Sequence, residues 1–484
     1  MAGIGVKLKK VYEKSSLLVR FSGFAYSMVV TIAPMVLVIV EIFFMGLVLG
    51  YNEVEYYRRE LFSCTVLYIF IFSQLSSAPF NAVLSRYMSD VIYEERYGDI
   101  MPAFYVGFLI NSLFSGIPAI IFCLHEYSTG NVDGIFVFLG FAGYISSMFV
   151  FYCMLYLSIC KDYSKITGFY FLGMGIAFIL GIVFVKLLGM EITMGMLAAV
   201  DTGFFIIAVL EYAQIKSYFR ENNRTYSRVM SYFKSFFLLI ISNGLYVAGL
   251  YVHNFVFWTT DIRMVVADSF VCAEPYDMAT FLALVTNISS SMIFISNVEL
   301  RFHDRYKKYS EAIIGGRLID IENTKLRMFR QLSAELLNLA RTQFIISVII
   351  FLTFLVFLPR FGFSGMVMQI YPMLAVSYYV LFLMYGGLIF LYYFNDLLGA
   401  AFTSILFFVT TLIASIGASH LDIIWYGVGL LAGSVVGWWF VYFRIRWVER
   451  NIEEHTFCRG TILAKAQGKV PSSRVYVKRD ADHV

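Results

Sequence analysis

Two carboxylates lie inside long apolar runs of the sequence, where acids are rare. Glu41 falls within the run over residues 24–50, and Asp201 falls within the run over 194–215. A charged carboxylate at the centre of a bilayer costs about 2.5–3.5 kcal/mol on insertion scales, so such a group faces the protein interior or a watery cavity. Each acid therefore suits the uptake of a proton or a cation during transport. The alternative for each is a buried protonated acid, or an acid bonded to a neighbouring helix.

Neutral polar side chains form three further stripes at helical spacing. The run over 62–84 contains Gln74, Ser77, Asn81 and Ser85, which lead to Arg86. The run over 235–258 contains Asn243, Tyr246, His253, Asn254 and Trp258. The run over 277–298 contains Asn287, Ser290 and Asn297, which lead to Glu299. Residues three, four or seven positions apart share a helix face, so we expect the stripes to line one polar cavity. Hydrogen bonds between packed helices, worth about 0.6 kcal/mol each, are the alternative.

The elements that must position these residues are membrane-spanning helices. Hydrophobic residues make up 60% of the 484 and charged residues 14%, against about 45–50% and about 25% in soluble domains. A helix needs about 20 apolar residues to cross the bilayer core. The predicted fold class is an all-α polytopic membrane protein with about twelve transmembrane helices. Their apolar runs cover residues 24–50, 62–84, 102–124, 135–160, 166–188, 194–215, 235–258, 277–298, 342–358, 370–393, 397–416 and 424–443.

The basic residues predict the direction of these helices. With a cytoplasmic N-terminus, 32 of the 37 Lys and Arg residues fall in cytoplasmic segments. The outer segments then keep only Arg58, Arg59, Lys186, Arg263 and Arg360. Because cytoplasmic loops carry the excess of Lys and Arg, both termini are expected in the cytoplasm. The net charge of +4 is explained by the Lys and Arg residues of the cytoplasmic segments, and it gives no reason to expect a nucleic-acid partner.

An even number of helices suggests an organisation in two halves. Residues 1–215 would form an N-terminal six-helix bundle, and residues 216–234 a basic cytosolic linker. Residues 235–443 would form a second six-helix bundle, followed by a basic cytosolic tail over 444–484. A plan of six plus six helices is common to several transporter folds.

The second half contains one unusual cytosolic insertion, over residues 299–341. After the break at Gly315 and Gly316, apolar residues recur at three- and four-residue steps, which predicts an amphipathic helix that runs into the ninth span. The apolar seam consists of Ile321, Met328, Leu332, Leu336 and Leu339. It could lie on its own bundle or on the anionic inner leaflet. The more specific hypothesis is that this seam is a docking site for a cytosolic partner.

No pattern in the sequence points to enzymatic chemistry. We find no nucleotide-binding motif, zinc-ligand cluster or Ser/His/Asp grouping, so we expect no catalytic residue, metal site or cofactor. The six cysteines, scattered without CxxC spacing, are interpreted as small hydrophobic residues.

Several segments resemble those of one known family, the Pel exopolysaccharide transporters (PelG). They are the N-terminal "MAGIGVKLKKVYEKSSLLVRFSGFAYSMVVTIAPMVLVI", "HNFVFW" at 253–258, "EPYDMATFLALVTNISSSMIFISNVELRFHDRYKKY" at 274–309 and "LYYFNDLLGA" at 391–400. The chain departs from the family pattern at Ala33, at Ser289 and Ser290, and at Asn395. On this resemblance, the family-motif positions are His253, Asn254, Trp258, Tyr276, Asp277, Glu299 and Tyr306.

The resemblance implies a fold and a function. The superfamily also contains the MATE drug exporters and the lipid-linked oligosaccharide flippases, and its fold is two six-helix bundles around a central cavity. Family members work in the bacterial cytoplasmic membrane with a cytosolic glycosyltransferase and a cyclic-di-GMP-responsive membrane partner. They export Pel, an amino-sugar polymer of the biofilm matrix, so the expected substrate is a polysaccharide or a lipid-linked saccharide.

Two other functions stay open at this point. Glu41 and Asp201 also fit a cation-coupled efflux pump for small amphiphiles. The large cytosolic insertion also fits a membrane scaffold that assembles the polysaccharide synthase without transporting anything itself.

Overall fold

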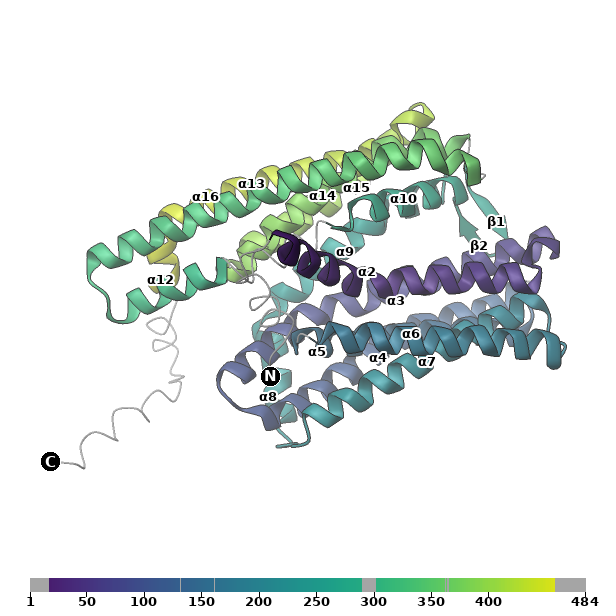
Figure 1. The fold of residues 1–484 in the computed structure, drawn as a ribbon, viewed down its shortest axis with the longest axis horizontal. Coiled ribbons are helices and arrows are strands. Elements are labelled where there is room, and N and C mark those ends of the chain that lie inside the picture. Colours follow the sequence, from purple (N-terminus) through teal and green to yellow (C-terminus); the bar gives the residue numbers. More distant parts are fainter. Residues whose placement is uncertain are drawn as a thin grey trace.

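The computed structural model describes residues 17–457 except 131, 161, 290–301, 362 and 364, and it is almost entirely helical. The first half contains α2 (Leu17–Leu49), α3 (Tyr56–Tyr93), α4 (Ile100–Thr129), α5 (Gly134–Ile159), α6 (Tyr163–Ile182) and α7 (Ile192–Tyr218). Short helical turns join them at Tyr51–Glu53, Tyr97–Asp99 and Val183–Leu187. Figure 1 shows this half below the second half, in purple to blue.

The second half follows a short helix, α8 (Tyr226–Ser235), that lies in the linker. It contains α9 (Phe237–Phe257), α10 (Glu274–Asn287), α12 (His303–Gly315), α13 (Leu318–Phe357), α14 (Met366–Tyr393), α15 (Leu397–Ala418) and α16 (Val428–Phe457). Further turns lie at Leu358–Phe361 and Ile423–Trp425. Between α9 and α10, β1 (Met264–Val266) and β2 (Phe270–Cys272) pair antiparallel, with Val265 opposite Val271.

In the described part of the chain, each of the twelve predicted spans contains a helix. Among the described residues, ten helices are long and apolar enough to cross a membrane. The apolar part of α2 over Ala33–Leu49 is shorter, and α10 is described only as far as Asn287. The prediction of an all-α polytopic membrane protein is therefore confirmed, with the hairpin β1–β2 as an addition that the hydropathy pattern did not predict.

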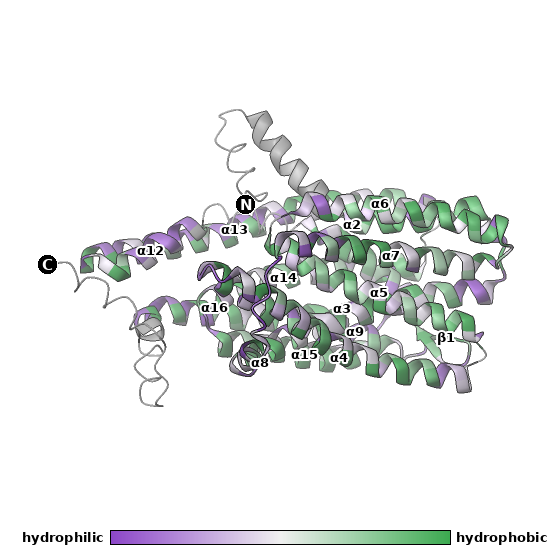
Figure 2. Ribbon diagram, turned by 90° about the horizontal axis from the view of Figure 1, so that it is seen from below, coloured by the Kyte–Doolittle hydropathy of each residue, from purple (hydrophilic) through white to green (hydrophobic). Residues whose placement is uncertain are grey.

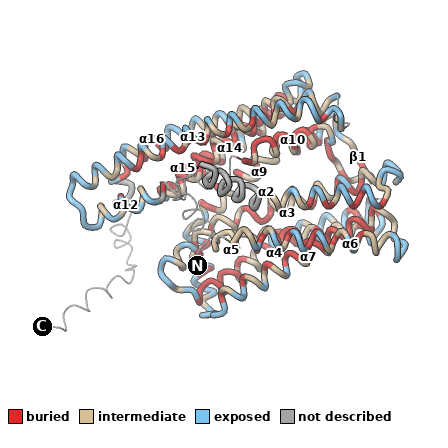
Figure 3. The backbone as a smooth tube through the Cα atoms, viewed as in Figure 1, coloured by how far each residue is buried: buried red, intermediate tan, exposed pale blue. Residues whose placement is uncertain are grey.

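The buried side chains form two hydrophobic cores. One is built mainly from α2 to α8, with Leu239 of α9 and the hairpin β1–β2, and the other mainly from α9 to α16. Within the first half, α7 packs against α5 and α6, and α3 packs against α5; within the second, α15 packs against α9 and α16. Figure 3 shows the buried residues along the inner faces of both bundles. This arrangement agrees with two bundles, and the division at 215 and 235 remains our proposal.

The insertion forms a helical hairpin that extends beyond the bundles. The helices α12 and α13 meet at Gly316, where a Cβ atom would lie 2.6 Å from the Ala312 carbonyl oxygen, so the turn requires glycine. The amphipathic helix and the ninth span are one continuous helix, α13, as the sequence predicts. Figure 2 shows hydrophilic residues concentrated on α12 and on the N-terminal part of α13.

The linker docks onto the first half. The Asp99 carboxylate accepts hydrogen bonds from Asn223 Nδ2 at 3.1 Å and from Thr225 Oγ1 at 3.0 Å, and it forms an ion pair with Arg96. The backbone N–H of Asn223 also donates to the Gly98 carbonyl oxygen at 2.9 Å. The segment between the halves is therefore fixed to the loop before α4.

Candidate functional site

Two of the predicted polar stripes face each other where α3 of the first half meets α9 of the second. The Tyr251 hydroxyl donates a hydrogen bond to Gln74 Oε1 at 2.6 Å, and Asn243 Nδ2 donates to the Ala78 carbonyl oxygen. Two residues before Gln74 on α3, the Phe72 ring stacks on the Phe255 ring of α9, with the ring centroids 5.8 Å apart. The interface between the halves thus contains half-buried amide, hydroxyl and aromatic groups in succession.

Arg86 lies at the far end of the α3 stripe. Its Nη1 donates to Asn395 Oδ1 at 2.8 Å, and its guanidinium lies 4.3 Å from the centre of the Phe236 ring. Asn395 forms the turn between α14 and α15 with a φ of 56°, a left-handed conformation that asparagine tolerates well. Within the described residues, Arg86 Nε and Asn81 Oδ1 have no hydrogen-bond partner. Both side chains are half-buried, but these two atoms are themselves buried, so this end of the stripe holds polar groups whose hydrogen bonds are unmade in the described part of the chain.

His253, Asn254 and Trp258 are fully buried and bind α10 to α9. Asn254 Nδ2 donates to Asp277 Oδ1 at 2.7 Å, and Trp258 Nε1 donates to Asp277 Oδ2 at 2.9 Å. His253 Nδ1 lies 2.8 Å from the Tyr276 hydroxyl. In this structure the three residues therefore make hydrogen bonds between helices, and they do not lie on an open polar surface as a cavity-lining role would require.

Asn287 has the same kind of environment. Its Nδ2 donates to the Ala375 carbonyl oxygen at 3.0 Å, and its Oδ1 accepts from the Ser347 hydroxyl at 2.7 Å. It thus joins α10 to α14 and α13 in the interior of the second half. The predicted cavity residues Asn297 and Glu299 lie outside the described residues.

The two predicted coupling acids lie buried in the first half. Glu41 and Asp201 are each 6% exposed, and among the described residues neither carboxylate has a hydrogen-bond partner. Gly143 on α5 leaves the space that the Asp201 carboxylate occupies, since a Cβ atom there would overlap it. A third acid, Glu211 on α7, is also fully buried and unpartnered within the described chain. The sequence reasoning missed Glu211, although it lies inside the same apolar run as Asp201.

A row of tyrosines on α14 was also missed. Tyr371, Tyr378, Tyr385 and Tyr392 are spaced by seven residues, which places them on one helix face. The row points toward α9 and α10. The Tyr385 ring stacks on Tyr246 at 4.9 Å, the Tyr392 hydroxyl lies 2.8 Å from Ser242 Oγ, and the Tyr371 hydroxyl lies 2.9 Å from Thr286 Oγ1. The exact seven-residue repeat was the signal in the sequence.

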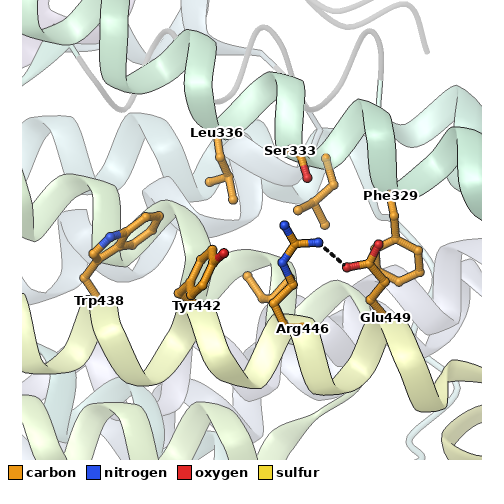
Figure 4. Close-up of a pocket in the computed structure, with 9 residues that line it drawn as sticks. Phe329, Ser333, Leu336, Trp438, Tyr442, Arg446 and Glu449 are labelled. Carbon is orange, nitrogen blue, oxygen red and sulfur yellow. Dashed lines mark hydrogen bonds and ion pairs between the residues drawn. The ribbon is translucent and has the colours of Figure 1, made fainter.

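The apolar seam of α13 is covered by the chain itself. Met328, Leu332 and Leu339 are at most 2% exposed, while Ile321 and Leu336 are half-buried. Figure 4 shows the groove between α13 and α16, where Leu336 faces Trp438 and Tyr442. Lys325 Nζ also pairs with Glu453 Oε1 of α16 at 3.0 Å. Because the five seam residues already pack on their own bundle, they do not offer the free surface that the docking hypothesis assigned to them.

Among the described residues, no group of three or more His, Cys, Asp or Glu side chains lies close enough together to hold a metal ion.

A comparison with family models identifies the family. The model described as "PelG: Putative exopolysaccharide Exporter (EPS-E)" matches residues 1–457. The chain belongs to the PelG family. The resemblance carried by "HNFVFW" and the neighbouring segments is thereby confirmed. No curated protein matches the sequence.

Solved structures that resemble this PelG-family chain are MATE transporters. An outward-facing multidrug resistance MATE transporter of the MOP superfamily matches with a TM-score of 0.57 and 13% identity, over 88% of this chain and 96% of that one. The eukaryotic MATE transporter AtDTX14 matches with a TM-score of 0.54 and 12% identity, over 87% and 93%. At these identities the likeness shows the fold alone. This PelG-family chain is a multi-pass membrane protein with a MATE-like transporter fold.

Proposed function

We propose that this PelG-family protein exports a Pel-type exopolysaccharide, an amino-sugar polymer, across the bacterial cytoplasmic membrane. The observation that carries the proposal is the match of the exopolysaccharide exporter family over residues 1–457, on a chain with a transporter fold. In the proposal, a cytosolic glycosyltransferase makes the polymer and a cyclic-di-GMP-responsive membrane partner controls it. Both termini and the hairpin of α12 and α13 lie in the cytoplasm.

The polymer path in this proposal follows the interface between α3 and α9. Sugar rings have apolar faces that suit flat aromatic rings such as Phe72, Phe255 and Tyr251, and sugar hydroxyls suit the amides of Gln74 and Asn81. The Tyr251–Gln74 hydrogen bond links the halves directly, so it has to break when they separate. Two halves that rock against each other give alternate access to such a central path.

Glu41 and Asp201 are the proposed coupling acids. Both carboxylates are buried without a described partner, which favours their neutral, protonated form in this conformation. Loss of the proton, or binding of a cation, would then require the surrounding helices α2, α5 and α7 to rearrange. The same observation favours a second candidate function, a cation-coupled efflux pump for small amphiphiles.

A test in cells separates these two functions. In a bacterium that makes the polymer, deletion of the gene for this chain should abolish external polymer, and the full chain should restore it. Resistance to cationic dyes and drugs should stay within about twofold of the parent strain. The reverse pattern, with external polymer unchanged and drug resistance lost, would establish the efflux pump instead.

A matched pair of variants then tests the path. Gln74→Leu removes the acceptor of the Tyr251 hydroxyl at the interface between the halves. Thr353→Val removes a polar group whose hydroxyl bonds only within its own helix, to the Ile349 carbonyl oxygen. We expect Gln74→Leu to lower external polymer severalfold and Thr353→Val to leave it unchanged, at equal protein abundance. Equal export by both variants would remove Gln74 from the path.

A further inference from the structure

The hairpin β1–β2 joins the two halves at one end of the molecule. It belongs to the second half by sequence, yet Val266, Phe270 and Cys272 are buried in the hydrophobic core of the first half. The Tyr68 hydroxyl on α3 donates to the Val271 carbonyl oxygen at 2.7 Å and accepts from the Val271 N–H at 3.0 Å. Figure 1 shows the hairpin between the two bundles, at the end opposite to α8 and α12. The hairpin therefore links the two bundles at this end.

Two cysteines from different halves meet inside this contact. Cys64 lies on α3 and Cys272 on β2, and their Sγ atoms are 2.7 Å apart. Both side chains are buried, with 2% and 3% exposed, and both are free thiols in the structure. Such an approach brings two thiols that are 208 positions apart in the sequence into reach of a covalent bond. The interpretation of all cysteines as small hydrophobic residues is therefore incomplete for this pair.

The surroundings hold the pair in place. The Tyr68 ring, one turn along α3 from Cys64, stacks on Trp258 with the centroids 5.2 Å apart and also contacts Phe270 at 5.3 Å. On the far side of the hairpin, the Ser269 hydroxyl donates to the Glu126 carboxylate of α4. The strand that carries Cys272 is thus fixed to the first half by contacts on both sides of the pair.

The predicted orientation places this end outside the cytoplasm. Arg58, among the few basic residues assigned to the outer segments, lies six positions before Cys64. Disulfides form and persist in the oxidising compartments outside the cytoplasm and are rare within it. The pair therefore lies on the side of the membrane where its oxidation is favoured.

We propose that Cys64 and Cys272 form a disulfide that covalently links the two halves at their outer end. Each thiol gives up one proton and one electron as the sulfur–sulfur bond forms. The two electrons pass, through a mixed disulfide, to the disulfide of an extracytoplasmic thiol oxidase, which leaves as the dithiol. Because both thiols are buried once the hairpin has docked, the oxidase reacts before docking or while this end is open.

The bond has a consequence for movement. The hairpin cannot leave α3 while the bond is intact, so a molecule that carries the bond keeps its outer end closed, and export falls to the molecules in which the bond is reduced. This consequence rests on the proposed transport function, in which the halves separate at each end in turn. The existence of the bond does not depend on that function.

A cleavable linker tests the bond directly. A protease site is inserted after Arg220, an exposed position of the linker, and the full chain is purified with its free thiols blocked by a maleimide. After cleavage, the halves should run as one species on a denaturing gel without reductant and as two species with it. Cys64→Ser and Cys272→Ser should each release the halves without reductant. Cys123→Ser and Cys160→Ser are the matched controls and should keep the halves joined.

The uncut wild-type chain gives a second measurement that needs no variant. Its peptide containing Cys64 should be found joined to the peptide containing Cys272, with a mass lower by two hydrogen atoms than the two thiol peptides together. Full maleimide labelling of both cysteines after denaturation without reductant would overturn the proposal. So would separation of the halves of the cleaved wild-type chain on the gel without reductant.

Export measurements test the closing effect separately. Reductant should raise export by the wild type severalfold and leave export by Cys272→Ser unchanged. Equal export by the linked wild type and Cys272→Ser would refute the closing effect while leaving the disulfide intact. A failure of the proposed function would look different, since no variant would export and the gel result would be unaffected.

Discussion

At the scale of single residues, the Asp277 carboxylate explains why polar side chains end an apolar helix. It accepts hydrogen bonds from Asn254 and Trp258 of α9, and from the backbone N–H of Ala273 at 3.0 Å. It also lies in the first turn of α10, where the helix dipole favours a negative charge. Asn254 and Trp258 are thus donors to a buried acid, and they position α10 against α9.

This arrangement predicts a loss of stability when Asn254 is changed. Asn254→Leu removes one donor and leaves the Asp277 carboxylate buried with a bond unmade, which costs about 1–3 kcal/mol, or more if the group is charged. We expect a lower melting temperature in detergent and reduced membrane abundance. Thr353→Val, which removes a hydroxyl bonded only within its own helix, is the control and should change neither. A melting temperature of Asn254→Leu equal to that of the wild type would contradict this role.

At the scale of elements, α13 packs on its own half, chiefly against α12 and α14, and it forms a groove with α16. Leu332 lines the groove formed with Tyr442 and Ile445 of α16, and Met328 is buried in the same hydrophobic core. The amphipathic pattern shows that this face must be covered, because exposed apolar area is unfavourable in water. It does not show which surface covers it, since a second helix, a lipid leaflet and a partner protein all satisfy the same pattern.

Two double variants separate packing from docking. Changing Met328 and Leu332 together to Ser empties a buried site, and losses of this kind cost about 2–5 kcal/mol per large side chain. We expect a clear drop in the melting temperature. Changing Leu326 and Leu337 to Ser, at positions that are 54% and 61% exposed, should leave the melting temperature unchanged. A melting temperature of the Met328 and Leu332 variant equal to that of the wild type would show that these side chains do not stabilise the bundle, and would favour a docking site for a partner.

The linker gives a second prediction at this scale. Asp99 is buried and bonds to Asn223 and Thr225, so Asp99→Ala leaves these two donors without their acceptor. We expect faster proteolysis of residues 216–234 and a loss of about 1–3 kcal/mol in stability. Glu221→Ala, at an exposed position of the same linker, is the control. Unchanged proteolysis of the linker in Asp99→Ala would show that docking does not depend on this acid.

The sequence predicts the helices better than it predicts the contacts between them. Hydropathy is a local property, so the apolar runs fall on helices wherever the structure describes them. The Asn254–Asp277 bond and the docking of Cys272 against Cys64 depend on how distant segments pack, which no local pattern contains. The turn residues of the hairpin, Ala267 and Asp268, have positive φ values without being glycine, so the usual signal of a tight turn was missing. The tyrosine row on α14 was visible as a seven-residue repeat and was overlooked.

At the scale of the whole molecule, orientation is the first property to test. The bias of Lys and Arg predicts that the hairpin of α12 and α13 lies in the cytoplasm and that the loop after α2 lies outside. In a chain without reactive native cysteines, Asn52→Cys should react with an impermeant maleimide in cells whose cytoplasmic membrane is intact. Lys307→Cys, whose parent side chain is 68% exposed, should react only after that membrane is permeabilised. The opposite labelling pattern would reverse the topology.

Transport of the polymer itself is the central claim, and inside-out membrane vesicles test it most directly. Vesicles containing this chain, the glycosyltransferase and the membrane partner are supplied with a radiolabelled nucleotide amino-sugar and then treated with a hydrolase that digests external polymer. Our account predicts that labelled polymer accumulates inside the vesicles, protected from the hydrolase until detergent is added. Gln74→Leu vesicles should make polymer but protect severalfold less of it. If the wild-type vesicles make polymer that the hydrolase digests completely, the chain is a scaffold for synthesis and the transport account is wrong.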